Sequence, residues 1–187
     1  SGMLQMREVG SQVFIAEKVR AENEGRVARL IEAARIESRD HGTKWPSVDD
    51  IPELAGGEGQ HQREELRDAL NGVVSFLAGS PGTGKTFTAA ALIKTIMRVY
   101  PTALISAAAP TGKAAVRLTE SLDKCGVKLA AKTVHSLLGV KANGDDGFGF
   151  NHDAKNPLPH KFVLIDEASM IDTSLMASLL AARPMGG

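Results

Sequence analysis

The feature that most constrains the fold of this chain is the octapeptide Gly-Ser-Pro-Gly-Thr-Gly-Lys-Thr at residues 79–86. It fits the pattern G-x-x-x-x-G-K-[ST] in full, in which glycines let backbone N–H groups converge on phosphate oxygens without clashes from Cβ atoms. Such a loop needs a strand before it and a helix after it. The sequence predicts both, with a short buried strand at Val73–Ala78 and a helix at Lys85–Tyr100 that Pro101 ends.

Lys85 and Thr86 carry the chemistry expected of this loop. Lys85 is expected to reach the β- and γ-phosphates of a nucleotide, and the Thr86 hydroxyl to bind Mg²⁺. The phosphates would lie at the N-terminus of the following helix, where the helix dipole favours negative charge. The residues of this segment that are predicted to contact the nucleotide are Gly79, Pro81, Gly82, Thr83, Gly84, Lys85, Thr86 and Phe87.

The segments that follow alternate between strands and helices. Apolar runs predict buried strands at Ala103–Ala109 and Phe162–Ile165, and helical patterns cover Gly112–Asp123 and Thr173–Ala182. Asn143–Pro159 is rich in Gly, Asn and Asp, which predicts a long loop or an inserted hairpin. The alternation indicates an α/β fold with a parallel sheet and helices on both faces.

A small helical region is predicted to precede this α/β part. Apolar residues recur at helical spacing between charges, which predicts a helix over 11–39 with Gly25 as a candidate break. The glycine-rich loop at 56–59 is the best internal boundary. We therefore expect a helical region over 1–58 and the α/β domain over 59–187.

Two acidic residues follow the apolar strand at Phe162–Ile165. Asp166 and Glu167 would lie at the carboxyl edge of the sheet, where ligands bind in such folds. Asp166 is expected to hold Mg²⁺, and Glu167 to orient or deprotonate an attacking water. The alternative is that this pair only caps a helix N-terminus, and the loop at 79–86 makes that alternative less favourable.

The charges of the chain are unevenly distributed. It holds 22 basic and 22 acidic residues, so the formal net charge is zero. Residues 73–142, however, hold nine Lys or Arg and only two acids, Glu120 and Asp123. A basic block of this kind is typical of phosphate or nucleic-acid surfaces, but solvated helix faces produce the same pattern, and charge alone favours the second reading.

Composition also indicates the cellular compartment. Cys125 is the single cysteine, which excludes an internal disulfide and a cysteine metal cluster. No apolar run approaches the roughly 20 residues that span a bilayer, and the N-terminus does not resemble a signal peptide. Ser1-Gly2 ahead of Met3 is typical of the remnant of a purification tag. These features predict a cytoplasmic protein without a membrane partner.

Five segments together carry a specific family pattern. They are Gln62-Arg63, the loop at 79–86, Ala109–Ala115 (APTGKAA), Thr133–Gly139 (TVHSLLG) and Leu164–Asp172 (LIDEASMID). In order and spacing they resemble the superfamily 1 helicases, specifically the RecD-like branch. The resemblance implies a RecA-like motor domain that uses ATP and Mg²⁺ and translocates on single-stranded DNA.

The resemblance also implies roles for individual residues. Gln62 and Arg63 correspond to a pair that contacts the nucleotide, with Gln62 on the adenine, and Lys85 and Glu167 to catalytic residues. The implied DNA contacts are Pro110, Thr111, Gly112, Lys113 and His135. From the residues alone, Thr, Gly and Lys at a strand end suit a sugar–phosphate backbone, whereas a lone histidine is more often structural.

Parts of the family pattern are missing. The chain has no motif III and no second motor domain, whose arginines complete the ATP site in the family. Residues 59–187 are therefore expected to be the first motor domain (1A), truncated before motif III. Because arginine fingers contribute roughly 10³–10⁵ in rate, we expect the chain to bind Mg-ATP and hardly hydrolyse it. The implied partners are single-stranded DNA and the second motor domain of the same parent chain.

Three alternatives remain open. An AAA+-type P-loop ATPase that does not act on nucleic acid would keep the loop and the acidic pair, but would give no reason for Gln62, APTGKAA or TVHSLLG. A relaxase-linked helicase has similar motor motifs. A non-catalytic nucleotide-binding module would not depend on Lys85.

Overall fold

The computed structural model of the chain describes residues 4–9, 12–41, 49, 51–52, 63–64, 66–67, 73–77, 84–142 and 148–183. The strands are β1 (Leu4–Val9), β2 (Gln12–Glu17), β3 (Ile105–Ala109), β4 (Lys132–Thr133), β5 (Val140–Ala142), β6 (Phe148–Phe150) and β7 (Phe162–Ile165). The helices are α1 (Lys18–His41), α3 (Lys85–Val99), α4 (Gly112–Lys124), α5 (Val134–Leu138) and α6 (Thr173–Ala181), with a 3-10 turn η5 at Ala168–Met170.

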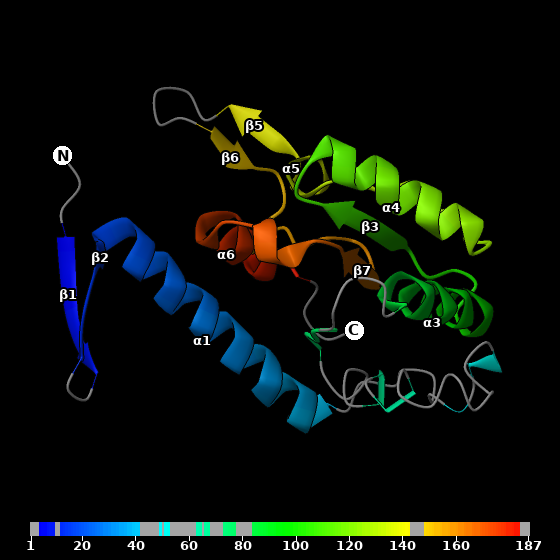
Figure 1. Cartoon of the computed structure of the whole chain (residues 1–187), viewed down its shortest axis with the longest axis horizontal. Coiled ribbons are helices and arrows are strands. Elements are labelled where there is room, and N and C mark those ends of the chain that lie inside the picture. Colours follow the sequence, from blue (N-terminus) through cyan, green and yellow to red (C-terminus); the bar gives the residue numbers. More distant parts are fainter. Residues whose placement is uncertain are drawn as a thin grey trace.

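A parallel sheet of three strands, in the order β4-β3-β7, lies at the centre of the α/β part (Figure 1). Side chains of β7 alternate between its two faces. Phe162 and Leu164 pack with residues of α3 and α4, whereas Val163 and Ile165 pack with residues of α5 and α6. Helices therefore cover both faces, and the predicted α/β class with a parallel sheet is confirmed.

The N-terminal residues differ from the helix predicted over 11–39. β1 and β2 pair antiparallel, with Val9 opposite Gln12, and the helix begins only at Lys18. β2 contains Val-Phe-Ile, residue types that suit strand pairing, and the two residues between the strands are the length of a tight hairpin turn. The sequence carries both signals, but the predicted helix was placed over them and therefore begins too early. α1 then runs through Gly25 without a break.

The strand predicted at Val73–Ala78 is absent from the part that the structure describes, residues 73–77. None of residues 73–77 belongs to a strand in the described part, and the Phe76 side chain is 61% exposed. A strand that is apolar on both faces is stable only when neighbouring elements cover those faces.

The first and second parts of the chain are in contact. α1 packs against α6, and Figure 1 shows the β1–β2 hairpin at the far end of α1, away from the parallel sheet. Ile51 is 1% exposed and packs with Leu66 and with α3 residues Leu92 and Ile96. The predicted boundary at residue 58 lies outside the described residues and stays a prediction.

The segment after α5 contains the inserted hairpin that was one of two predictions for Asn143–Pro159. β5 and β6 pair antiparallel, with Val140 opposite Phe150. The pairing starts three residues earlier than predicted. Ahead of it, Lys132–Leu138 divides into the short strand β4 and the one-turn helix α5. None of the helices among the described residues has the length and apolar character needed to cross a membrane.

Candidate nucleotide and nucleic-acid site

The strands β3, β4 and β7 end at the same edge of the sheet. Ala109 pairs in register with Thr133, and Ala108 with Ile165. The backbone N–H of Asp166 also donates to the Ala108 carbonyl oxygen at 2.9 Å. Parallel register therefore brings together three segments that are distant in sequence, namely the residues that directly follow each strand.

The segment after β3 begins α4 and leaves polar groups in solvent. Thr111 is the N-cap of α4, and its Oγ1 accepts a hydrogen bond from Ala114 N at 3.2 Å. Thr111, Gly112 and Lys113 are exposed, and Pro110 is half-buried. The first turn of this 13-residue helix holds no acidic residue, so the helix end and Lys113 both favour an anion.

The segment after β4 presents His135. Thr133 caps α5, since its Oγ1 accepts from Ser136 N at 3.1 Å. Val134, Leu137 and Leu138 are buried and hold this turn on the core. The His135 side chain is exposed instead, which is not the environment of a structural core histidine. Its ring lies beside that of Phe150, with the centroids 6.0 Å apart.

The segment after β7 holds the acidic pair in an unusual backbone conformation. Asp166 Oδ1 accepts a hydrogen bond from the Glu167 backbone N–H at 2.9 Å. Glu167 has φ 52° and ψ 38°, and it is the one non-glycine residue with positive φ among the described residues. The left-handed region costs an L-residue roughly 1–2 kcal/mol, and such strain concentrates at functional sites. The Glu167 side chain is exposed, so its burial does not explain this backbone conformation.

Gly84, the described end of the predicted phosphate loop, has a backbone conformation that is compatible with phosphate binding. Gly84 has φ 80° ahead of α3, a conformation that favours glycine. The N-cap residue, Gly84, has no side chain that could cap this end of α3, and the first turn holds no acidic residue. An uncapped, acid-free helix N-terminus fits a nucleotide phosphate. Lys85 and Thr86 are half-buried in that first turn, and Phe87 is 48% exposed.

The oxygen atoms of Thr86 and Asp166 are ligands of the kind that Mg²⁺ prefers. These residues therefore fit the predicted metal in chemical type. The remaining residues predicted to bind the nucleotide in the loop, together with Gln62, lie outside the described residues: Gly79, Pro81, Gly82 and Thr83.

Arg63 is engaged with an acidic residue. Its Nη2 lies 2.6 Å from Asp49 Oδ1, and Arg67 Nη2 lies 3.6 Å from the same oxygen. The predicted nucleotide contact of Arg63 stays a prediction, and the ion pair supplies a second role for this side chain.

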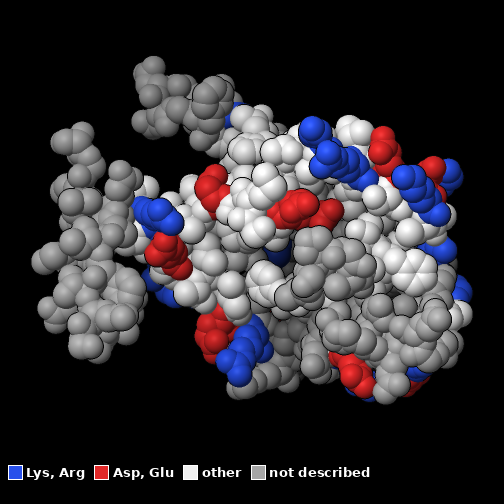
Figure 2. Space-filling model, viewed as in Figure 1, with Lys and Arg blue, Asp and Glu red and all other residues white. Residues whose placement is uncertain are grey.

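The basic block contributes unevenly to this surface. On the face shown in Figure 2, Lys and Arg side chains lie at the upper right, where Figure 1 places α4, with acidic side chains among them. Lys128 pairs with Asp123. Lys113 lies at the start of α4 beside the strand ends, whereas Lys124 lies at its other end. Position along α4 therefore separates Lys113 from Lys124.

Comparison with known proteins identifies the family. A family model described as an AAA domain matches residues 62–186. The RecBCD enzyme subunit RecD of Mycolicibacterium smegmatis is 37% identical over 155 residues, which cover 74% of this chain and 28% of that protein. The ATP-dependent RecD2 DNA helicase of Deinococcus radiodurans is 42% identical over 137 residues, covering 73% of this chain and 18% of that helicase. This chain belongs to the RecD-like superfamily 1 helicases.

A third relative, the RecBCD enzyme subunit RecD of Haemophilus influenzae, is 35% identical over 138 residues, or 65% of this chain and 21% of that subunit. The RecD-like chain thus spans between about a fifth and about three tenths of the lengths of these relatives. The family prediction is confirmed.

The sequence did not identify Phe150 or Thr133 as parts of the site. Thr133 carried a usable signal, because a threonine three residues ahead of Ser136 is a typical N-cap. Phe150 carried none, since it reaches His135 only through the pairing of β5 with β6.

Proposed function

We propose that this RecD-like chain is the ATP-binding part of a helicase motor that translocates on single-stranded DNA. The observation that carries the proposal is the parallel register of β3, β4 and β7. It brings Thr111 and His135, the predicted DNA contacts, to the same sheet edge as the acidic pair at 166–167. A change at the acidic pair on ATP binding can therefore be transmitted to the DNA contacts through adjacent, hydrogen-bonded strands.

Each residue of the nucleotide site has a distinct task in this proposal. Lys85 neutralises charge on the β- and γ-phosphates, and Thr86 and Asp166 hold Mg²⁺. Glu167 orients and deprotonates the attacking water. The hydrogen bond from the Glu167 backbone N–H to Asp166 Oδ1 orients the Asp166 carboxylate for the metal, and the exposed Glu167 carboxylate remains available to water.

Hydrolysis by these 187 residues is expected to be slow. In the family, arginines of a second motor domain complete the ATP site, and arginines of this kind contribute roughly 10³–10⁵ in rate. We therefore propose that the chain binds Mg-ATP and turns it over negligibly without that domain.

Two other functions explain less of the site. An AAA+-type ATPase that does not act on nucleic acid would need the loop and the acidic pair, but not the exposed Thr111, Lys113 and His135 at the same edge. A relaxase-linked helicase would use the same motor geometry and differ only elsewhere in the parent protein.

The proposal is tested by fluorescence anisotropy with a labelled single-stranded oligo-dT at low salt, and in parallel with a fluorescent ATP analogue. Lys113→Ala should weaken DNA binding severalfold. Lys124→Ala is the matched control, because it removes the same charge about 16 Å along the same helix and should leave binding unchanged. Lys85→Ala should abolish nucleotide binding and spare DNA binding. Nucleotide binding without any DNA binding would instead support the AAA+-type function.

A further inference from the structure

Asp49 contacts two arginines of the helical segment at residues 63–67. Arg63 Nη2 donates to Asp49 Oδ1 at 2.6 Å, and Arg67 Nη2 lies 3.6 Å from the same oxygen. The two arginines are four positions apart, so they lie one turn apart on the same face of the helix. Asp49 precedes Arg63 by 14 positions. The contact therefore joins two separate parts of the chain.

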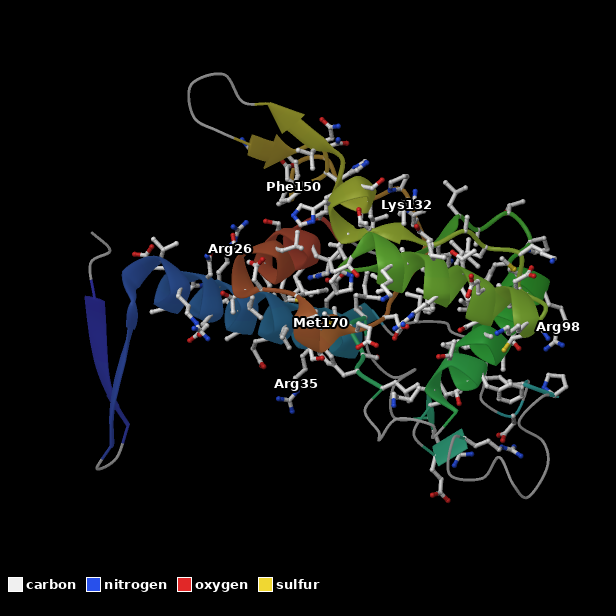
Figure 3. The ribbon with its side chains drawn as sticks, turned by 45° about the horizontal axis from the view of Figure 1, so that its top comes forward. Arg26, Arg35, Arg98, Lys132, Phe150 and Met170 are labelled. Atoms are coloured by element: carbon white, nitrogen blue, oxygen red, sulfur yellow. The ribbon has the colours of Figure 1, made fainter. Side chains whose placement is uncertain are left out.

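A buried residue next to Asp49 fixes the position of its carboxylate. Ile51 is buried and packs with Leu66, which is also buried and lies between the two arginines in the sequence. The same cluster contains Leu92 and Ile96 of α3. Asp49 and the segment at 63–67 therefore share one anchor on α3, the helix whose N-terminus is the proposed phosphate site. Figure 3 shows the described residues of that segment, in blue-green, beside α3 on the side away from α4.

The contact with Asp49 leaves most of the Arg63 guanidinium available. A guanidinium has five N–H donors in a planar fork, and the hydrogen bond to Asp49 uses Nη2 alone. The Arg63 side chain is 28% exposed, against 58% for that of Arg67. Arg63 is thus the more enclosed of the two arginines, and Asp49 orders it while leaving donors for a second acceptor. Ordering a side chain in advance reduces the entropy that is lost when a ligand binds.

The charges of this group suit an anionic ligand. One carboxylate is shared by two guanidinium groups, so Asp49, Arg63 and Arg67 together keep a positive charge. Glu64, the next residue, lies about 100° further around the helix. Asp49 is 64% exposed, and an ion pair at such a position contributes at most about 1 kcal/mol to stability. Its larger effect is on the direction in which Arg63 points.

We propose that Asp49 is a positioning residue of the nucleotide site. It orients the Arg63 guanidinium so that the remaining donors meet the nucleotide, while Arg67 offsets the charge of the carboxylate. The inference rests on the proposed function and on the predicted contact of Arg63 with the nucleotide. It adds a role in nucleotide binding for a residue that lies ahead of every motif of the family pattern.

Two other roles for Asp49 predict different results. If Asp49 only forms a surface ion pair, removing its charge leaves nucleotide affinity unchanged. If Asp49 competes with the nucleotide for Arg63, removing its charge tightens binding, because the ligand is itself an anion. Only the positioning role predicts that nucleotide binding weakens when this negative charge is removed.

The experiment measures the affinity of the full chain for a fluorescent ATP analogue in the presence of Mg²⁺. Arg63→Gln should weaken binding roughly tenfold or more, as expected for the loss of a hydrogen bond from a charged group, and Asp49→Asn roughly fivefold. In the Arg63→Gln background Asp49→Asn should cause no further loss, because it acts through Arg63. Asp49→Glu keeps the carboxylate and should retain more affinity than Asp49→Asn. Glu32→Gln is the matched control, since Glu32 is a similarly exposed ion-pair partner of Arg35 on α1, and it should bind as wild type does.

The outcomes separate this proposal from the proposed function. If wild type does not bind the analogue, or if Lys85→Ala binds it as tightly as wild type, the proposed function fails. If Lys85→Ala abolishes binding but Asp49→Asn leaves the affinity unchanged or increases it, the positioning role is overturned while the proposed function stands. An equal effect of Asp49→Asn with and without Arg63 also overturns it. Urea midpoints should differ little between wild type and Asp49→Asn, because the ion pair is exposed, so a loss of affinity is not a loss of folded protein.

Discussion

Arg183 Nη1 donates a hydrogen bond to Glu37 Oε2 at 2.6 Å. Arg183 lies two residues beyond the end of α6, so the bond joins this part of the chain to α1. The two residues are 146 positions apart, and their side chains are only 13% and 15% exposed. Little water competes with this ion pair. It connects the N-terminal helix directly to the α/β part of the molecule.

Removing one partner of this pair should be costly. Glu37→Ala and Arg183→Ala are each expected to lower the free energy of unfolding by about 3 kcal/mol, because each removes the ion-pair partner of a largely buried charge. The double variant Glu37→Leu/Arg183→Met should recover most of the loss, since an apolar pair of similar size often replaces a buried ion pair without cost. Urea denaturation of all three variants measures this cycle. Single variants that each cost under about 0.5 kcal/mol, as at exposed pairs, would show that the contact is weak.

The backbone of Glu167 should separate stability from catalysis. Glu167→Gly is expected to raise the free energy of unfolding by about 1 kcal/mol, because glycine adopts the left-handed region without strain. Glu167→Gln should leave stability unchanged. Both variants should still bind a fluorescent ATP analogue and should lose the slow hydrolysis of the chain by at least about 100-fold in single-turnover assays. Unchanged hydrolysis in Glu167→Gln would remove this side chain from the catalytic role.

Gly139 should tolerate no side chain. Its φ is 70°, and an added Cβ would lie 2.8 Å from Asn151 Nδ2 and 3.2 Å from Asn151 Cβ. Gly139→Ala is therefore expected to lower the free energy of unfolding by about 1–3 kcal/mol. Adding Asn151→Ala relieves the contact but not the backbone strain, so part of the loss should remain. Gly112→Ala is the control, because a Cβ there meets no described atom within 4 Å, and it should not destabilise.

Folding stability should depend on pH through His160. Burial lowers the pKa of His160 below its ordinary value of 6.5, and the positive charges of Lys132 and His152 add to that effect. Just below pH 6.5 the unfolded chain then binds more protons than the folded one, so stability is lost as the pH falls. His160→Asn should flatten this dependence when urea midpoints are compared from about pH 7.5 to about pH 5. Equal slopes in both proteins would assign the dependence to other groups.

Much of the α/β part could be predicted from the sequence because its signals are local. Four apolar residues that run into Asp166 predicted β7 at its observed bounds, and Pro101 predicted the end of α3 to within a residue. The strand expected at Val73–Ala78 had an equally clear local pattern. Its failure over residues 73–77 shows that an apolar run forms a strand only where the fold supplies a neighbour and a cover.

The candidate site likewise contains residues that the sequence predicted and an arrangement that it did not predict. Thr111, Lys113 and Glu167 were predictable because each directly follows or begins a regular element. Their convergence depends on the register of β3, β4 and β7. The packing and order of the parallel strands set that register, and no short segment of the sequence encodes it. The partnership of His135 with Phe150 depends on a hairpin and was beyond sequence reasoning for the same reason.

The most direct test of the central claim, that this edge of the sheet binds single-stranded DNA, is the salt dependence of oligo-dT affinity for wild type, Lys113→Ala and Lys124→Ala. For single strands the slope of log K against log salt is about −0.7 for each phosphate contact. The account predicts that Lys113→Ala makes the slope shallower by about 0.7 and that Lys124→Ala leaves it unchanged. Wild-type affinity that is undetectable at low salt, or a slope that Lys113→Ala does not alter, would contradict it.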